Sequence, residues 1–152
     1  MMITGIHDHK LRAPAALFLF CSLLVAACTS QQKYASPTVV GSAAVVEISS
    51  LQPETPLFFT YQYHNKNINF FVLRMDNGVQ SYLDACASCY PHKLGYKCED
   101  GSVVCRACGM KFSVYKLEKG LGGCYPIRIE GRTEKDKYLI PLTSLEAEAG
   151  KF

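Results

Sequence analysis

Four cysteines in two C-x-x-C pairs are the residues of this sequence best suited to chemistry. The first pair is Cys86 and Cys89, the second is Cys105 and Cys108, and residues 90–104 separate them. Two residues between cysteines let both sulfurs point at one centre, as in metal knuckles that end β-hairpins. The spacing therefore predicts a metal site with these four cysteines as ligands.

The same spacing has two other interpretations. Six cysteines follow the N-terminal segment, and in an oxidising compartment they could form three disulfides. C-x-x-C is also the motif of thiol–disulfide exchange, here with Cys105 and Cys108 as the redox pair. That chemistry needs a thiolate at a helix N-terminus, and neither pair opens a predicted helix. Metal binding is favoured, and the other two interpretations stay open.

Three further residues are candidates for an additional metal or redox role. Cys124, in "GLGGCYP", is interpreted equally as an extra ligand or redox partner, and as a buried thiol or the disulfide partner of Cys98. Cys98 falls between the two pairs. His92 follows Cys89 by three residues and could be a ligand, although a surface histidine in a loop is the favoured interpretation.

Short apolar segments rich in Val, Ile, Phe and Tyr must position these cysteines, and this composition predicts strands. Asp-Asn-Gly at 76–78 and Asp-Gly at 100–101 predict tight hairpin turns. The hairpin at 96–105 would bring both cysteine pairs to the same side, and Gly109 is expected to take a positive φ. The predicted strands are 38–49, 57–63, 68–75, 79–84, 102–105, 111–115, 125–130 and 137–142.

Close spacing of these strands predicts a mainly β fold, a small single-domain β sandwich or barrel with two cysteine-bearing hairpin loops. Strands do not alternate with long helices, which argues against Rossmann and thioredoxin architectures. Residues 65–67 and 131–136 are predicted as longer turns. A short helix is expected after Thr143, with Thr143 as its cap and Glu146 reaching back.

The N-terminal segment predicts a bacterial lipoprotein. Lys10 and Arg12 precede fifteen uncharged residues, 13–27, the length of a signal-peptide core rather than a membrane span. Small residues lead directly to Cys28, as in the lipobox whose cysteine is acylated. The predicted organisation is a signal peptide at 1–27, a lipidated N-terminus and tether at 28–37, and a β domain at 38–152.

The charge of the chain excludes one class of partner. Lys and Arg total 16 against 13 Asp and Glu, and no basic stripe interrupts this near balance, so a nucleic-acid partner is not expected. The lipobox predicts a location in the bacterial cell envelope, anchored by lipid and facing the periplasm. Thr29 after the cysteine favours the outer membrane over the inner.

The region from Leu83 to Ile127 resembles the membrane iron–sulfur-containing protein family typified by FtrD, a component of bacterial ferrous-iron transport systems. The pattern is D-A-C-x-x-C, G-Y, an acidic-Gly turn, V-C-x-x-C-G, a Phe and G-G-C-x-P. Its elements here are Asp84-Ala85-Cys86, Cys89, Gly95-Tyr96, Asp100-Gly101, Val104-Cys105, Cys108-Gly109, Phe112, Gly122-Gly123-Cys124 and Pro126. With the preceding strand pair, the resemblance covers residues 57–142.

The cysteine region is more distantly similar in plan to Rieske domains. There, two ligand-bearing loops enclose a [2Fe–2S] cluster and a third loop covers it. This chain has Cys where a Rieske domain has the second ligand His of each pair, and four thiolates would give a lower potential. The site is therefore expected to be Rieske-like or zinc-ribbon-like.

These resemblances imply an extracytoplasmic electron-transfer or metal-handling accessory of ferrous-iron uptake, without substrate turnover of its own. They favour an iron–sulfur cluster or iron as cofactor, with zinc as the alternative because both metals accept tetrahedral sulfur. The implied partners are the membrane, through the lipid anchor, and a membrane iron permease or redox protein. The alternatives are a structural zinc-binding interaction module and an envelope thiol–disulfide oxidoreductase.

Overall fold

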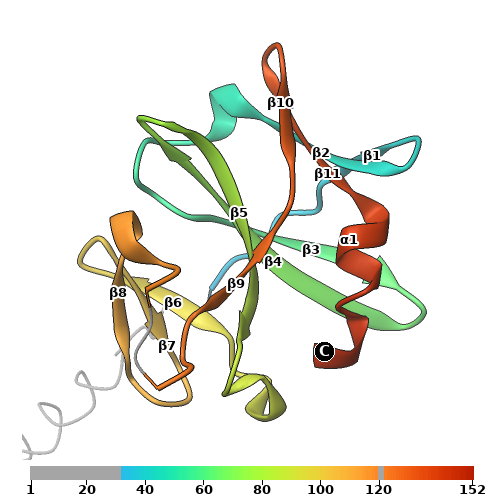
Figure 1. Ribbon diagram of the computed structural model, residues 1–152. Coiled ribbons are helices and arrows are strands. Elements are labelled where there is room, and N and C mark those ends of the chain that lie inside the picture. Colours follow the sequence, from blue (N-terminus) through green and yellow to red (C-terminus); the bar gives the residue numbers. More distant parts are fainter. Residues whose placement is uncertain (1–31, 120–121) are drawn as a thin grey trace, which may run out of the picture. The chain divides into compact units, whose positions relative to one another are not determined.

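Strands of the chain assemble into three antiparallel sheets in a computed structural model that describes residues 32–119 and 122–152 (Figure 1). Their orders are β1-β2-β11-β10, β3-β4-β5-β9 and β6-β7-β8. The strands are β1 Thr38–Val40, β2 Ala43–Glu47, β3 Leu57–Tyr63, β4 Lys66–Met75, β5 Gly78–Cys86, β6 Tyr96–Glu99, β7 Ser102–Cys105, β8 Lys111–Ser113, β9 Pro126–Ile129, β10 Arg132–Glu134 and β11 Lys137–Pro141. The predicted mainly β fold is confirmed, and within the described ranges the sheets stay open instead of closing into a barrel.

Short helices connect or end these strands. One α-helix, α1 Leu142–Glu146, follows β11, and four 3-10 turns complete the described ranges: η1 Ile48–Ser50, η2 Tyr90–His92, η3 Val114–Lys116 and η4 Ala149–Lys151. No helix in the described part of the chain has the length and apolar character needed to cross a membrane. The predicted signal peptide, Cys28 and the start of the tether lie outside the described residues.

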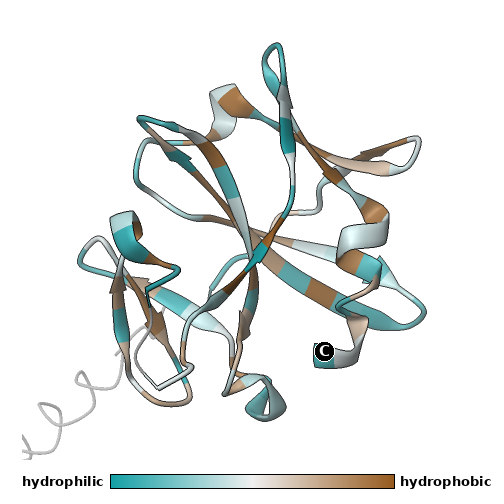
Figure 2. Cartoon of the chain, in the orientation of Figure 1, coloured by the Kyte–Doolittle hydropathy of each residue, from teal (hydrophilic) through white to brown (hydrophobic). Residues whose placement is uncertain are grey.

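The central sheet, β3-β4-β5-β9, is buried on both faces. Side chains alternate in direction along a strand, so Phe70 and Val72 of β4 face one side while Phe71 and Leu73 face the other. All four are fully buried, which explains the nearly unbroken apolar run of β4 (Figure 2). The sequence predicted this strand as central, and the structure confirms it.

Two cores lie on the two faces of the central sheet. The apolar core, between this sheet and β2, β11 and α1, consists of Ala44, Val46, Leu51, Phe59, Ile68, Phe70, Val72, Leu83, Ala85, Ile129, Tyr138, Ile140 and Leu145. The sulfur-side core, toward β6-β7-β8, consists of Phe58, Phe71, Leu73, Tyr82, Cys86, Tyr96, Val103, Cys105, Phe112, Val114, Leu117 and Cys124. Each large apolar side chain buried in either core contributes about 1.5–3 kcal/mol.

Tight turns connect the hairpins. Asp100 and Gly101 both take positive φ (49° and 70°) in the predicted turn between β6 and β7. The prediction of longer turns was wrong at two places. His64 and Asn65 make a two-residue turn into β4, and residues 132–134 form β10, which pairs with β11 across a turn at Lys135.

The N-terminal part of the domain differs from its prediction. The segment 38–49 is two strands, since a turn at Gly41, whose φ is +58°, folds β1 back onto β2. Ala35, predicted in the tether, exchanges backbone hydrogen bonds of 2.9 Å with β3, through the Phe58 carbonyl and the Thr60 amide. The structured domain therefore begins before residue 38.

The short C-terminal helix forms without the predicted cap. It starts after Pro141, and the Thr143 side chain does not cap it. Glu146 accepts a hydrogen bond of 3.0 Å from the Tyr61 hydroxyl of β3, so its carboxylate is used for tertiary packing. The capping prediction was wrong because the helix begins at Leu142, which places Thr143 inside the first turn instead of before it.

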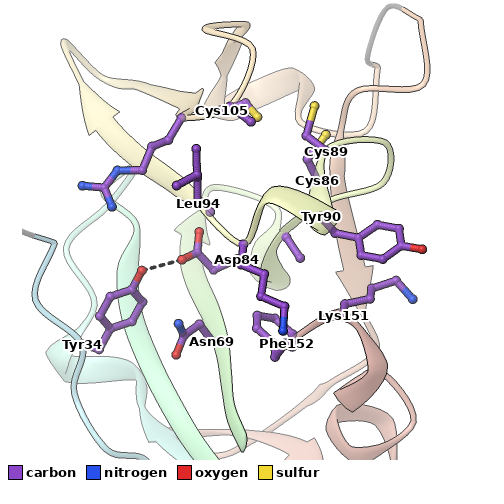
Figure 3. A pocket seen from close by; sticks show the side chains of 15 residues that line it. Tyr34, Asn69, Asp84, Cys86, Cys89, Tyr90, Leu94, Cys105, Lys151 and Phe152 are labelled. Carbon is purple, nitrogen blue, oxygen red and sulfur yellow. Dashed lines mark hydrogen bonds between the residues drawn. The ribbon is translucent and has the colours of Figure 1, made fainter.

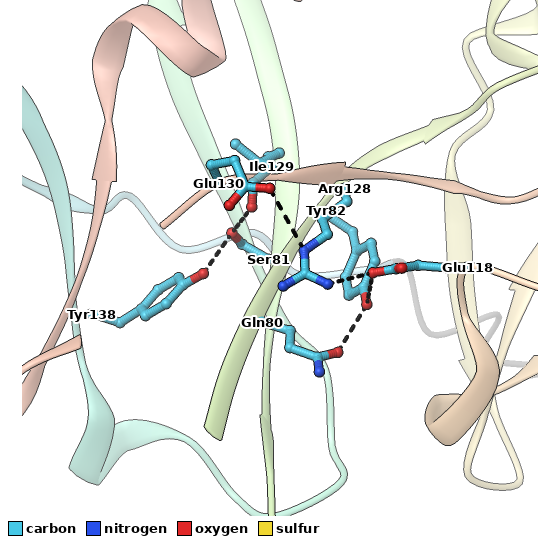
Figure 4. Close-up of polar contacts among 8 residues, drawn as sticks. All are labelled: Gln80, Ser81, Tyr82, Glu118, Arg128, Ile129, Glu130 and Tyr138. Carbon is cyan, nitrogen blue, oxygen red and sulfur yellow. Dashed lines mark hydrogen bonds and ion pairs between the residues drawn. The ribbon is translucent and has the colours of Figure 1, made fainter. Parts of the chain in front are cut away.

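Polar contacts fix β9 beside β5 (Figure 4). The Ser81 hydroxyl donates to the Ile129 carbonyl at 2.9 Å and lies 3.1 Å from the Tyr138 hydroxyl. On the other side of the strand, the Arg128 guanidinium donates to Glu118 at 2.7 Å. Because Glu118 follows η3, this ion pair ties the segment after β8 to β9.

Candidate metal centre

Three loops meet at one end of the sulfur-side core. The first follows β5 and carries Cys86 and Cys89, the second follows β7 and carries Cys105 and Cys108, and the third precedes β9 and carries Cys124. Cys86, Cys105 and Cys124 are buried, Cys89 is partly buried and Cys108 is exposed. Figure 3 shows the Cys86, Cys89 and Cys105 side chains grouped beside a cavity.

Sulfur atoms from all three loops converge. The Sγ atoms of Cys86, Cys89, Cys105 and Cys124 all lie within 4.8 Å of one another. The Cys124 sulfur is 3.0 Å from that of Cys86 and 3.3 Å from that of Cys108. Three of the four predicted ligands, Cys86, Cys89 and Cys105, thus lie together, and Cys124 completes the set in place of the predicted Cys108. The exposed Cys108 sulfur lies beside that of Cys124.

Backbone geometry shapes the second loop. Gly109, directly after Cys108, has a φ of +73°, in the region that glycine enters most readily, as the sequence predicted. Its amide donates to the Cys105 carbonyl at 2.8 Å, and the Cys105 amide donates to the Met110 carbonyl at 2.9 Å. These bonds close a knuckle that turns both sulfurs to the same side. No helix begins at this pair.

Two hydrogen bonds from the first loop fix the position of the third loop. The Ser88 hydroxyl donates to the Gly123 carbonyl at 2.8 Å, and the Ala87 amide donates to the Tyr125 carbonyl at 3.0 Å. These two bonds flank Cys124 and hold its side chain over Cys86. The family resemblance placed Cys124 in the motif but left its role open, because these contacts join residues far apart in the chain.

Asp84 helps to hold the first two cysteine loops in position. It lies two residues before Cys86 on β5, so both side chains face the sulfur-side core. Its carboxylate, only 4% exposed, accepts a hydrogen bond from the Tyr34 hydroxyl at 2.5 Å (Figure 3). It accepts a second one from the Tyr96 amide at 2.6 Å. The bond to Tyr96 fixes the start of β6, and thereby the hairpin that carries Cys105.

The Asp84 carboxylate lies so close to the backbone of residue 95 that only a glycine fits there. A Cβ atom at residue 95 would lie 2.4–2.7 Å from the Asp84 carboxylate, and the backbone has a φ of +63°. Burial raises the pKa of Asp84 to about 6, against the opposing effects of its two hydrogen bonds and of Arg106. No role for this carboxyl was predicted from the sequence. Its position two residues before Cys86 in a strand was the one sign that both side chains would lie on the same face of the sheet.

The environment of the thiols favours partial ionisation. Burial raises the pKa of Cys86, but hydrogen bonding with Cys124 and with backbone amides outweighs it and lowers this pKa to about 7. The Met110 amide and the Cys124 thiol lower the pKa of Cys108. Burial and the neighbouring sulfurs raise the pKa of Cys89 and of Cys124. Thiols packed this closely share protons, and a cation would replace them.

The Tyr96 hydroxyl points into the sulfur group. It is fully buried and makes no hydrogen bond with any described residue. Burial raises the pKa of Tyr96, and so does its contact with the Cys86 sulfur. A buried hydroxyl without another partner needs an acceptor. A metal-bound thiolate at the neighbouring Cys86 would be a stronger acceptor for this hydroxyl than the thiol is.

The remaining predicted candidates lie apart from the sulfur group. Cys98 is exposed on β6, opposite Val103, and is not bonded to Cys124. His92 is exposed in η2 and does not belong to the set of potential ligands that the described residues contain. All six described cysteines are free thiols, and no two of them form a disulfide.

The donor set fits a thiophilic metal. Bonds of about 2.3 Å from a tetrahedral ion place its four sulfurs about 3.8 Å apart, and four sulfurs here lie within 4.8 Å of one another. A tetrahedral ion requires four ligands, and the three loops bring five sulfurs together: those of Cys86, Cys89, Cys105, Cys108 and Cys124. In a [2Fe–2S] cluster each iron takes two of the cysteines, so the ligand pairs must stand further apart.

Comparisons with known proteins agree with this donor set. The family model described as "Membrane iron-sulfur containing protein FtrD-like" matches residues 51–152. No curated protein matches the chain. A solved structure provisionally described as a nitrite reductase NADPH (small subunit) oxidoreductase protein is similar at 12% identity, covering 63% of this chain and 93% of that one, with a TM-score of 0.38. A likeness of that size supports no inference about function.

Proposed function

Because the chain belongs to the FtrD-like family of membrane iron–sulfur-containing proteins, we propose that it binds iron through its grouped cysteines and passes electrons or metal in the bacterial cell envelope. It would act as an accessory of ferrous-iron uptake, without converting a substrate itself. The observation that carries this proposal is the convergence of four sulfurs within 4.8 Å. Iron bound by thiolates supplies one-electron chemistry.

The compact sulfur group makes a single iron ion the simplest occupant. Cys86 and Cys105 are nearly inaccessible to solvent, at 3% and 1% exposure, and the Cys124 sulfur lies 3.0 Å from Cys86. A di-iron cluster requires the two C-x-x-C pairs to separate around it, and the buried members have little room to move apart. The presence or absence of acid-labile sulfide distinguishes these two occupants.

The centre is close enough to the surface to meet a partner. Cys108 is exposed, and the cysteine loops carry exposed Tyr90, Leu94 and Tyr125. Lys93 and Arg106 line the adjacent cavity of about 130 Å³. Basic side chains among exposed aromatic and aliphatic residues suit an acidic docking face. We assign that face to a membrane iron permease or a redox protein.

The predicted N-terminus would bring the domain to such a partner. Acylation of Cys28 would anchor the chain in a membrane, with the outer membrane favoured by Thr29. Residues 28–33 would then span from the lipid to Tyr34, which contacts the domain through Asp84. Metabolic labelling with a fatty-acid probe tests the anchor, since Cys28→Ala should remove the label and release the protein from membranes.

Metal analysis tests the proposal directly. The full chain is purified in detergent without oxygen, and iron, zinc, copper and acid-labile sulfide are measured together with the visible and EPR spectra. We expect about one iron per chain, lost in Cys105→Ser and retained in Cys98→Ser, since Cys98 lies apart from the sulfur group. Metal-free protein whose cysteines resist alkylation until reduced would contradict the proposal.

A structural zinc site is the second candidate, because the burial of Cys86, Cys105 and Cys124 is typical of closed zinc centres. The same purification separates the two functions. Stoichiometric zinc, with a domain that stays folded but carries no redox signal, would make the chain an interaction module. Iron with a reversible one-electron couple would exclude that role.

Iron uptake itself requires a cellular measurement. Deletion of the gene should slow ferrous-iron accumulation in iron-poor medium, and a copy encoding Cys98→Ser should restore it while a copy encoding Cys105→Ser should not. Unchanged accumulation in the deletion strain would remove the uptake role and leave the metal site in place.

A further inference from the structure

The N-terminal strap, Tyr34 and Ala35, packs on the same side of the central sheet as the sulfur group. The Ala35 backbone exchanges hydrogen bonds of 2.9 Å with the Phe58 carbonyl and the Thr60 amide of β3. The Tyr34 ring meets the Phe58 ring edge-on, with centroids 5.9 Å apart, and contacts the sulfur-side core. The strap therefore has a fixed position, from which the Tyr34 hydroxyl donates to Asp84 at 2.5 Å.

The Asp84 carboxylate carries this constraint to the second cysteine loop. Its other oxygen accepts a hydrogen bond from the Tyr96 amide at 2.6 Å. The carbonyl of the preceding residue, Gly95, accepts a hydrogen bond of 3.0 Å from the amide of Arg106, which directly follows Cys105. Tyr96 also pairs with Cys105 across β6 and β7. One buried carboxylate thus has two donors, the strap and the start of the hairpin, and holds them together.

Tyr34 also forms part of the wall of the cavity beside the centre. This cavity of about 130 Å³ is lined by Tyr34 and, among other residues, by Cys86, Cys89 and Cys105 (Figure 3). Tyr34 is half-buried, so displacement of the strap would open this part of the wall to solvent. The position of the strap therefore bears on two properties of the centre, how firmly its second loop is held and how easily solvent reaches its sulfurs.

We propose that Tyr34 is a positioning residue of the metal centre, which acts through Asp84 to hold the loop that presents Cys105. Docking of the strap and closure of the centre are then one event. When the strap leaves, the carboxylate loses one of its two donors, the hairpin is held less firmly, and the cavity opens toward the sulfurs. The readouts below that use bound iron rest on the proposed function, whereas hydrogen exchange does not.

Hydrogen exchange of the full chain, followed by mass spectrometry, tests the positioning role. Tyr34→Phe removes the hydroxyl and keeps the ring packed on Phe58. Tyr61→Phe is the matched control, because the Tyr61 hydroxyl also donates to a carboxylate, that of Glu146 at 3.0 Å, but on the side of the apolar core. The protein is purified in detergent without oxygen, and circular dichroism checks that each variant is folded.

We expect the amides of β6 to exchange at least about tenfold faster in Tyr34→Phe, since a hydrogen bond to a charged group is lost, and to be unchanged in Tyr61→Phe. In an Asp84→Ala background, Tyr34→Phe should add less than about threefold, because the coupling runs through that carboxylate. Wild-type exchange in Tyr34→Phe would overturn the proposal. So would an additive effect in the double variant, or equally faster exchange throughout β4.

Bound iron provides a second readout. Excess chelator should remove it several-fold faster from Tyr34→Phe than from the wild type, and faster again from Tyr34→Ala, which also removes part of the cavity wall. The EPR spectrum of Tyr34→Phe should differ from that of the wild type, because the ligand loop is held less firmly. Tyr61→Phe and Tyr61→Ala should match the wild type in both measurements.

A wild-type release rate in Tyr34→Ala would contradict the role of the strap. Wild-type protein that binds no metal is a different result, which would overturn the proposed function while the hydrogen-exchange test of Tyr34 still decides its own question.

Discussion

On one face of the central sheet, the apolar core consists of aliphatic and aromatic residues together with alanine, whereas on the other face three cysteines occupy core positions. The apolar core is enclosed by a four-stranded sheet and α1. The sulfur-side core is covered by β6, β7 and β8, which have only four, four and three residues. We expect hydrophobic burial to be sufficient for the first region, and so small a sheet to gain further stability from bound metal.

This comparison gives the cysteines a double role. Cys86 and Cys105 pack against Tyr96 and Phe71 as small apolar side chains do, and they also present sulfur to the centre. We therefore expect metal binding to be coupled to the folding of β6-β7-β8 and not to that of the apolar core. The predictions below test that difference, beginning with the largest expected effect.

Removing the metal should loosen one region only. When a chelator strips the reduced protein, we expect hydrogen-exchange protection of β6 and β7 amides to fall by at least about a thousandfold, since thiolate–metal binding supplies much of their folding energy. The amides of β4 should keep their protection. Exchange measured by mass spectrometry checks this, and equal losses on both faces would show that the molecule folds as one unit.

Two adjacent residues of β4 provide a matched pair. Phe70 and Phe71 are both fully buried, in the apolar core and in the sulfur-side core respectively. Each substitution to alanine should cost about 3–5 kcal/mol of unfolding free energy. Only Phe71→Ala should also weaken metal binding, by about tenfold, because Phe71 packs on Tyr96 with ring centroids 6.1 Å apart.

Urea denaturation and metal titration of the two variants check this prediction. A loss of metal affinity of the same size in Phe70→Ala would mean that the two cores are not energetically separable.

Asp84 should make stability depend on pH. Folding raises its pKa from 3.8 to about 6, so between these values the folded state binds more protons than the unfolded state. The free energy of unfolding of the metal-free protein should therefore fall as pH rises from about 4 to about 6, by up to about 1.4 kcal/mol per pH unit. Asp84→Asn should remove this slope.

Denaturation curves across that pH range measure the slope. Asp136→Asn, an exposed carboxyl on the β10–β11 turn, is the control and should keep the wild-type slope. A slope that persists in Asp84→Asn would assign the titration to another group.

The smallest effect concerns the Tyr96 hydroxyl. Tyr96→Phe removes a buried hydroxyl that is available to donate to a metal-bound Cys86 thiolate, and it leaves the packing of the ring intact. A hydrogen bond worth about 1 kcal/mol corresponds to about 40 mV for one electron. We expect the midpoint potential of the iron-loaded variant to be lower by about that amount, while its unfolding free energy changes little. Redox titration with an unchanged potential would show that the hydroxyl does not reach the ligand.

Sequence patterns predicted the local features of both regions well. Short apolar segments rich in Val, Ile, Phe and Tyr located β3, β4 and β5, and Asp-Gly and Gly109 gave the turns that shape the cysteine hairpin. These features depend on neighbours in the chain, so spacing is enough to find them. The two C-x-x-C pairs converge for the same reason, because a single hairpin connects them.

Features that depend on distant contacts were not predictable. The short polar strand β10 exists because β11 pairs with it, and Glu146 accepts a hydrogen bond from Tyr61 instead of capping the helix. Cys124 reaches the sulfur group through the bonds of Ser88 and Ala87 across the first and third loops. The role of Asp84 depends on its hydrogen bond from the Tyr96 amide, which is twelve residues away in the chain and reaches Asp84 only in the folded protein.

X-ray absorption at the metal edge tests the central claim most directly. The anaerobically purified full chain should show an iron ion with four sulfur neighbours at about 2.3 Å and no second iron shell. The same spectrum is expected for Cys98→Ser. A first shell of oxygen and nitrogen would contradict the account, because the metal would then be bound away from the five sulfurs that the fold brings together.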